Sequence, residues 1–217
     1  MGNVAFVFAG GDRPPPEALG GLPPPDVVIA ADSGLDHATA LGFAVDVIVG
    51  DLDSADPAAV DAAIAAGTVV ERHPEAKDAT DLELALLAAR TRGCERVVVV
   101  GGHGGRLDHF LANALLLASP ELADLQVEAR FGDARVFVVR SDQELQGAVG
   151  NLCTLLPLGG PAAGVRTEGL RFPLCRETLE PGSTRGVSNE FLVPVARVSL
   201  DDGVLLAIVV DNETTNR

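Results

Sequence analysis

The chain has 217 residues, of which 47% are hydrophobic, so it can bury a substantial core and is not a disordered polypeptide. With 16 Lys and Arg against 31 Asp and Glu, its net charge is −15. That charge argues against a general nucleic-acid binder and against docking on anionic lipid, because both need a basic face. No stretch approaches the roughly 20 apolar residues of a membrane span. The N-terminal segment lacks the basic region of a signal peptide, so we expect a cytoplasmic protein.

The first two-thirds of the chain alternates strand-like and helix-like segments. The expected strands are residues 4–8, 26–30, 45–49, 68–70 and 96–100, and the expected helices are residues 56–66, 81–91 and 107–117. Thr80 is the expected N-cap of the helix over residues 81–91. Continuous Val and Ile runs suit parallel strands that are covered on both faces. The alternation therefore predicts an α/β domain with a doubly wound parallel sheet.

The pattern changes after about residue 125. Short strand-like segments follow one another at residues 126–131, 135–140, 153–158, 164–167, 170–174, 191–198 and 204–210. They lack a helical period, and Gly, Pro and Asp stand at the turns, which predicts an antiparallel β-sandwich. We therefore expect two domains, an α/β domain over residues 1–141 and a β-sandwich over residues 142–217.

Acidic residues follow the ends of the expected strands. Asp32 comes after the second strand, and Asp51 and Asp53 come after the third, within GDLDS. Ligands of an open parallel sheet bind outside the carboxyl ends of its strands. Two carboxylates at this spacing can reach one hard cation such as Mg2+. The alternative is a turn in which the Asp and Ser side chains bond back to the backbone.

A second acidic motif, KDATD, stands at residues 77–81. Lys77 is a compact point charge suited to a phosphate. Asp78 and Asp81 lie near the expected helix start, where capping and the helix dipole also favour acids. The two interpretations are compatible, because an acid at a helix start can also face a metal.

The glycine-rich motif GGHGGRLDH occupies residues 101–109. Its glycines leave backbone amides free to wrap a phosphate, and Arg106 can offer a bidentate fork. The spacing matches neither the Walker P-loop nor the GxGxxG dinucleotide fingerprint. His103 and His109 can ligate a metal, and the alternative for the whole motif is a flexible strand-to-helix turn.

Two polar segments interrupt the β-rich part, TEGLRFPL at residues 167–174 and GVSNEF at residues 186–191. Ser188 and Asn189 are either a plain turn or contacts to a ligand. The chain has no Trp and no Tyr, so an aromatic substrate must stack on one of eight Phe residues. Phe172 is the candidate beside these segments, and core packing is its alternative role.

Taken together, these motifs resemble the bacterial type of thiamine pyrophosphokinase. The similar segments follow in order along the chain: ADSG at 31–34, GDLDS at 50–54, KDATD at 77–81, GGHGGRLDH at 101–109, TEGLRFPL at 167–174 and GVSNEF at 186–191. The family often has Gly where Ser33 stands, Gln where Ala79 stands, and Trp or Tyr where Phe172 stands. None of these departures removes an acid.

The resemblance implies transfer of the diphosphate of ATP to thiamine with Mg2+, giving AMP and thiamine diphosphate. It implies an ATP- and Mg2+-binding catalytic domain, a thiamine-binding sandwich, and a homodimer with thiamine held between the N-terminal domain of one subunit and the C-terminal domain of the other. The implied metal ligands are Asp32, Asp51, Asp53 and Asp81. The implied catalytic residues are Asp51, Asp53, Asp81 and Asp108, the last two as possible bases. The implied nucleotide contacts are Lys77, Asp78, Gly102, Gly104, Gly105, Arg106 and His109. The implied thiamine contacts are Phe172, Ser188 and Asn189.

Three other functions compete with this one. An apolar strand followed by DxD is also typical of haloacid-dehalogenase-type phosphatases, in which the first Asp is phosphorylated. A diphosphokinase for a pterin or another alcohol, and a non-catalytic nucleotide- or thiamine-binding regulator, use the same kind of scaffold. The full set of acids and the Ser188-Asn189-Glu190 segment favour the thiamine enzyme.

Overall fold

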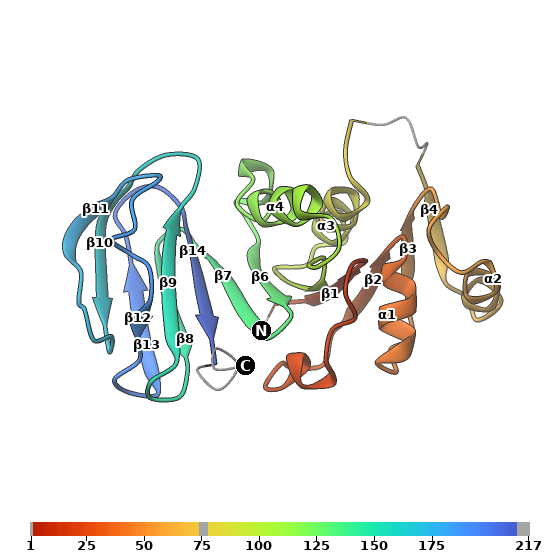
Figure 1. The fold of residues 1–217 in the computed structure, drawn as a ribbon. Coiled ribbons are helices and arrows are strands. Elements are labelled where there is room, and N and C mark those ends of the chain that lie inside the picture. The colour runs from red at the N-terminus through yellow and green to blue at the C-terminus, as the bar shows by residue number, and fades with distance from the viewer. Residues whose placement is uncertain (1, 74–77, 212–217) are drawn as a thin grey trace. The chain divides into compact units, whose positions relative to one another are not determined.

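The computed structural model describes residues 2–73 and 78–211, drawn in Figure 1. The chain divides into two compact units between Gly132 and Asp133. This division comes earlier in the chain than the expected boundary near residue 141. The reason is strand β7 (Ala134–Val139), which pairs with β14 (Leu205–Val210) and so belongs to the second unit.

The first unit is built on a parallel sheet. Its strands are β1 (Val4–Ala9), β2 (Val27–Ala31), β3 (Val47–Gly50), β4 (Val69–Arg72), β5 (Arg96–Gly101) and β6 (Gln126–Phe131). They lie in the order β6-β5-β1-β2-β3-β4, and every pair is parallel. The segment over residues 126–131, where the sequence turns β-rich, is therefore the last strand of the parallel sheet.

Helices connect these strands. They are α1 (Gly34–Ala40), α2 (Pro57–Ala65), α3 (Asp81–Thr91) and α4 (Leu107–Leu116), with 3-10 turns η1 (Pro16–Leu19) and η2 (Pro120–Leu122). The predicted N-cap is confirmed, because Thr80 Oγ1 accepts a hydrogen bond from the Glu83 N–H at 3.2 Å. Helix α1 was not predicted, since seven residues are too few to show a helical period.

Both faces of the sheet are covered. Alternate residues of β1 and β5, such as Phe8 and Val100, pack in one cluster with Ala38 of α1. Helix α3 contacts β1, β2 and β3 and lies on the face opposite α1 (Figure 1). The doubly wound arrangement is confirmed, and burial on both faces explains why these strands are continuous apolar runs.

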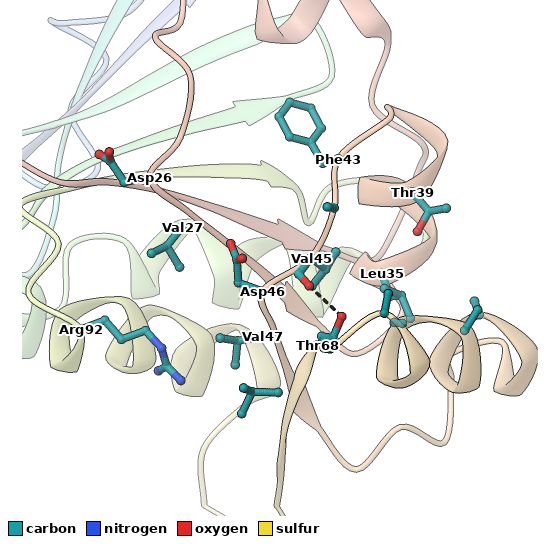
Figure 2. Close-up of a pocket in the computed structure, with 17 residues that line it drawn as sticks. Asp26, Val27, Leu35, Thr39, Phe43, Val45, Asp46, Val47, Thr68 and Arg92 are labelled. Carbon is teal, nitrogen blue, oxygen red and sulfur yellow. Dashed lines mark hydrogen bonds between the residues drawn. The ribbon is translucent and has the colours of Figure 1, made fainter.

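Acids at the amino ends of the strands hold the sheet register. The N–H of Val4 donates to Asp26 Oδ2, and the N–H of Val28 donates to Asp46 Oδ2, each at 2.8 Å. Both acids line a cavity of about 680 Å³ between α1 and α2, shown in Figure 2 with Phe43 above it. This cavity opens at the amino ends of β2 and β3, away from the carboxyl ends where the motif acids stand.

The second unit is a β-sandwich, as predicted. One sheet has the order β12-β9-β14-β7, and the other has the order β11-β10-β13-β8. The further strands are β8 (Asp142–Gln146), β9 (Leu152–Pro157), β10 (Ala162–Glu168), β11 (Cys175–Leu179), β12 (Asn189–Glu190) and β13 (Val195–Ser199). Leu145, Leu155, Val165 and Leu205 from the two sheets share one buried cluster.

Two strand predictions in this unit are wrong in detail. Residues 170–174 are irregular, with one isolated bridge from Leu170 to Phe191, and the strand expected from residue 191 begins at Val195. Pro173 and Pro194 interrupt these segments, because proline has no N–H for the ladder. Strands β8 and β11 were missed because both are polar edge strands.

In the part of the chain that the structure describes, every helix is too short or too polar to cross a membrane.

Candidate functional site

Three carboxylates gather at the carboxyl ends of β2 and β3. Asp32 follows β2, and Asp51 and Asp53 follow β3, which is the neighbouring strand. One oxygen from each of the three lies within 4.8 Å of the others. Strand adjacency therefore brings together acids that stand about twenty residues apart in sequence, as the motif spacing predicts.

The backbone at this acid cluster is strained. Asp32 has a φ of 46° and Leu52 a φ of 68°, in the left-handed region that side chains rarely occupy. The N–H of Asp53 donates to Asp51 Oδ1 at 3.1 Å, and Ser54 Oγ donates to Asp53 Oδ1 at 2.9 Å. The loop thus makes the Asx-type bonds of a turn and still presents carboxylate oxygens together. Strain of this kind collects at functional sites.

Asp81, the first residue of α3, lies beside the cluster. A side chain at Gly50 would bring its Cβ to 3.0 Å from Asp81 Oδ1 and to 3.3 Å from Asp32 Cβ. Burial raises the pKa of the Asp32 carboxyl, and the negative charges of Asp81 and Asp51 raise it further. The cluster therefore concentrates negative charge, and a bound cation would reduce the repulsion between its carboxylates.

The donor set fits a magnesium ion. Asp32 Oδ1 is buried and accepts no hydrogen bond from any residue that the structure describes. A buried carboxylate oxygen without a partner is costly, and a cation satisfies it. Mg2+ binds oxygen at about 2.1 Å, so ligand oxygens must lie within about 4.2 Å of one another. The oxygens of the acid cluster lie within 4.8 Å of one another, which is close to that spacing, and the Asp53 side chain is exposed.

We expect the acid cluster to make the metal-free protein less stable as the pH rises. The folded state holds the Asp32 proton more tightly than the unfolded chain, so this stabilisation is present below about pH 4 and is lost as the pH rises through the raised pKa. In EDTA, Asp32→Asn should therefore gain thermal stability over the wild type between pH 4 and pH 7. Thermal unfolding at both pH values measures this gain. If the difference in melting temperature between Asp32→Asn and the wild type were the same at pH 4 and pH 7, the prediction would be contradicted.

The glycine-rich loop after β5 needs its glycines. Gly101, Gly102, Gly104 and Gly105 all have positive φ angles. From α4, Asn113 Nδ2 donates to the Gly102 carbonyl at 2.9 Å and holds the loop. The loop thus has a defined shape at the same edge of the sheet as the acid cluster.

His103 of this loop has a structural role. Its Nδ1 accepts the N–H of Gly132 at 3.2 Å, and its carbonyl accepts the N–H of Asp12 at 2.7 Å. Nδ1 of His103 is therefore not available to ligate a metal while it accepts this hydrogen bond. His109 is exposed on the first turn of α4.

A glycine pair directly after β1, Gly10 and Gly11, lies between the loop after β2 and the glycine-rich loop. A Cβ at Gly10 would overlap Ser33 Oγ, and a Cβ at Gly11 would overlap the His103 carbonyl. The lack of side chains at Gly10 and Gly11 therefore allows the loop after β2 and the glycine-rich loop to pack directly against the end of β1. The detectable signal was glycines directly after a buried strand, the same pattern as at residues 101–105.

Arg106 and Asp108 pair with each other. Arg106 Nη2 donates to Asp108 Oδ2 at 2.7 Å, and its Nε donates to Oδ1 at 3.2 Å, with both side chains exposed. The hydrogen bonds from Arg106 lower the pKa of Asp108 to about 2. A carboxylate this acidic is a weak proton acceptor. Asp78 is exposed near the start of α3, and Lys77 lies outside the described residues.

In the second unit, Asn189 holds the Phe172 loop in place. Its side chain is buried, Oδ1 accepts the N–H of Phe172 at 2.9 Å, and Nδ2 donates to the Phe172 carbonyl at 2.8 Å. Oδ1 also accepts the N–H of Glu190. These bonds use Oδ1 and one N–H of the amide, so Asn189 positions its neighbours. Ser188 is exposed, has a φ of 57°, and donates its N–H to Thr154 Oγ1.

The core-packing alternative for Phe172 is wrong, because 52% of the residue is exposed. Because the chain has no Trp and no Tyr, this exposed ring, over which the Arg171 guanidinium lies at 5.9 Å from the centroid, is the candidate stacking face.

We expect Asn189→Ala to destabilise the second unit by about 1–3 kcal/mol, because it removes the partners of partly buried main-chain groups. Chemical denaturation followed by fluorescence of a bound dye or by circular dichroism measures the loss. Ser188→Ala is the matched control, since the bond to Thr154 comes from the Ser188 main chain. Equal stability of the two variants would show that the Asn189 amide is dispensable.

Comparison with known proteins explains the two-part arrangement. The sequence model of the thiamin pyrophosphokinase catalytic domain matches residues 24–129, and that of the thiamin pyrophosphokinase vitamin B1 binding domain matches residues 138–205. The chain belongs to the thiamin pyrophosphokinase family. The first model contains the acid cluster and the start of α4, and the second contains Phe172 and Asn189.

Curated members of this enzyme family show the same similarity. Thiamine pyrophosphokinase 1 of Arabidopsis thaliana is 28% identical over 184 residues, which is 75% of this chain and 64% of that protein. The rice protein of the same name is 25% identical over 77% of this chain and 67% of its own length. Thiamine pyrophosphokinase of Bacillus subtilis is 29% identical over 61% of this chain and 63% of its own. The matches thus span about two-thirds of these relatives.

Solved structures of the family share the fold. The thiamine pyrophosphokinase of Bacillus subtilis superposes with a TM-score of 0.84 at 24% identity, covering 97% of this chain and 100% of that one. That of Geobacillus thermodenitrificans has a TM-score of 0.80 at 25% identity, covering 97% and 99%. The predicted order of an α/β domain and a β-sandwich is confirmed.

Proposed function

We propose that this chain transfers the diphosphate group of ATP to the hydroxyl of thiamine, giving thiamine diphosphate and AMP, and that it requires Mg2+. One observation carries the proposal: Asp32, Asp51 and Asp53 meet at the carboxyl edge of the sheet, beside a shaped glycine-rich loop, within the segment that matches the family's catalytic domain. The β-sandwich that matches the vitamin B1 binding domain supports thiamine as the acceptor.

In the proposed reaction the thiamine hydroxyl oxygen forms a bond to the β-phosphorus of ATP. The bond from that phosphorus to the oxygen bridging it to the α-phosphorus breaks, AMP leaves with the electron pair, and the hydroxyl proton passes to a base. Such chemistry depends on in-line positioning and charge neutralisation. We prefer Asp81 as the base, because it lies beside the acid cluster.

Asp32, Asp51 and Asp53 would hold the metal, with Asp81 close enough to contribute. When bound, Mg2+ supplies charge neutralisation to phosphate oxygens. The amides of the glycine-rich loop would orient the nucleotide, together with Arg106 once it exchanges Asp108 for phosphate.

The remaining parts of the proposal concern the whole assembly. Residues 1–141 would bind ATP and Mg2+, and residues 142–217 would bind thiamine through Phe172 and Ser188, with Asn189 positioning Phe172. We also propose that the chain forms a homodimer and that it is cytoplasmic. Sedimentation equilibrium of the full chain measures the oligomeric state directly.

The experiment that tests the reaction incubates the full chain with ATP, Mg2+ and thiamine and follows AMP and thiamine diphosphate by chromatography. We expect both products in equal amounts and only with Mg2+. Inorganic phosphate without AMP would point to a phosphatase. ATP binding without turnover of thiamine would point to another alcohol acceptor, which a pterin alcohol can probe, or to a regulator.

A further inference from the structure

Helix α1 packs directly against the end of β1, where the candidate site begins. A Cβ at Gly34, the first residue of α1, would overlap the Phe8 carbonyl oxygen, and a Cβ at Gly10 would overlap Ser33 Oγ. Glycine at these two positions therefore permits a backbone approach that a side chain would block. The helix that follows Asp32 is thus fixed against β1 at its first turn.

His37 of α1 adds a side-chain bond to the same end of β1. Its Nδ1 donates to the carbonyl oxygen of Ala9, the last residue of β1, at 2.9 Å. A carbonyl oxygen can only accept, so Nδ1 is the ring nitrogen that carries the proton. A Cβ at Gly101, the residue that pairs with Ala9 on β5, would lie 3.3 Å from His37 Nδ1. The ring therefore lies where β1 and β5 both end.

The main chains of these two strands continue together beyond Ala9. The N–H of Gly102 donates to the Gly10 carbonyl, and the N–H of Asp12 donates to the His103 carbonyl, each at 2.7 Å. These bonds extend the pairing of β1 with β5 into the glycine-rich loop. A displacement of the Ala9 carbonyl would therefore displace the glycine-rich loop as well.

We propose that His37 is a positioning residue for the nucleotide. By holding the Ala9 carbonyl, its Nδ1–H fixes the spacing between the glycine-rich loop and Asp32, which stands two residues before the start of α1. A nucleotide with Mg2+ would contact both the glycine-rich loop and the acid cluster, so its affinity depends on that spacing. The inference rests on the proposed function, since it takes the glycine-rich loop as the nucleotide contact.

The test is calorimetric titration of the full chain, first with ATP and Mg2+ and then with thiamine. We expect His37→Leu, which keeps a bulky side chain and loses the donor, to weaken ATP binding roughly tenfold, about the worth of one hydrogen bond. Thiamine binding should not change. His37→Asn should bind ATP within about twofold of the wild type, because its side-chain amide also offers an N–H near the place of Nδ1. Thr39→Ala, an exposed position on the same helix, is the matched control and should change neither affinity.

Several results would overturn the positioning role. One is an ATP affinity of His37→Leu equal to that of the wild type, and another is an equal loss in His37→Leu and His37→Asn. A loss of affinity for ATP and thiamine alike would show a general effect on folding and would also overturn it. Nitrogen-15 NMR of the wild type tests the inference without any variant, because a His37 ring protonated at Nε2 and not at Nδ1 could not donate to Ala9.

The same titrations separate this inference from the proposed function. If the wild type binds ATP and does not convert thiamine, the proposed function fails, and the ATP affinities of the His37 variants still decide the positioning role. If the wild type does not bind ATP with Mg2+, the proposed function and this inference are both overturned.

Discussion

Replacing Asp51 with asparagine is expected to lower the turnover of thiamine at least about 10²-fold, the cost of losing one major electrostatic contribution to a charged transition state. Asp51 contributes an oxygen to the acid cluster and orders its loop by accepting the N–H of Asp53. Asparagine keeps an oxygen for that hydrogen bond and loses the charge, so the substitution isolates the electrostatic role. The chromatographic assay of AMP and thiamine diphosphate measures the loss.

Asp61→Asn is the matched control for this prediction. Asp61 is an exposed acid on α2 of the same unit, and it does not belong to the acid cluster. Its rate should equal that of the wild type. The melting temperature of metal-free Asp51→Asn should not fall, because the substitution removes a negative charge that opposes ionisation of Asp32. An unchanged turnover in Asp51→Asn would remove the metal role from this residue.

Glu128→Gln is expected to produce the largest loss of stability, about 3 kcal/mol in the free energy of unfolding, because it leaves buried positive charge without its counter-ion. Glu128 on β6 is 6% exposed and pairs with Arg130, 5% exposed, at 2.9 Å. It also pairs with Arg96 of β5 at 2.7 Å. The carboxylate therefore joins two arginines on neighbouring strands.

Urea unfolding followed by circular dichroism measures this loss. The control is Asp124→Asn, which removes the exposed ion pair with Arg90 and should change stability little. If Glu128→Gln and Asp124→Asn were equally stable, the ion pairs of Glu128 would contribute no more to the free energy of unfolding than an exposed pair does. Activity should fall only as far as the folded fraction falls, because Glu128 lies away from the acid cluster in sequence and is not one of its members.

Elements with strong local signals could be predicted from the sequence. The apolar runs over residues 4–8 and 96–100 became strands, and Thr80 caps the helix that begins at Asp81, because strand burial and capping depend on neighbouring residues. Segments without such signals were missed. Helix α1 is too short to show a period, and the edge strand β8 is too polar to read as a strand.

The candidate site divides in the same way. The sequence placed Asp32, Asp51 and Asp53 at strand ends, and parallel pairing of β2 with β3 then makes them neighbours. It could not show that Arg106 binds Asp108 and makes it a weak base, since both residues could equally have faced a ligand. Nor could it show that the Asn189 amide makes hydrogen bonds to the Phe172 main chain.

The sequence by itself determined the fold class, the order of the motifs and the edge of the sheet at which the acids stand, because strand periodicity and chain order are local properties. Only the tertiary structure decided which side chains are free to act. Gly10 and Gly11 matter because two distant loops approach them, and Phe172 is exposed because Asn189 holds its main chain from another segment. These contacts join residues far apart in the chain, and their geometry depends on packing, which the order of residues alone does not display.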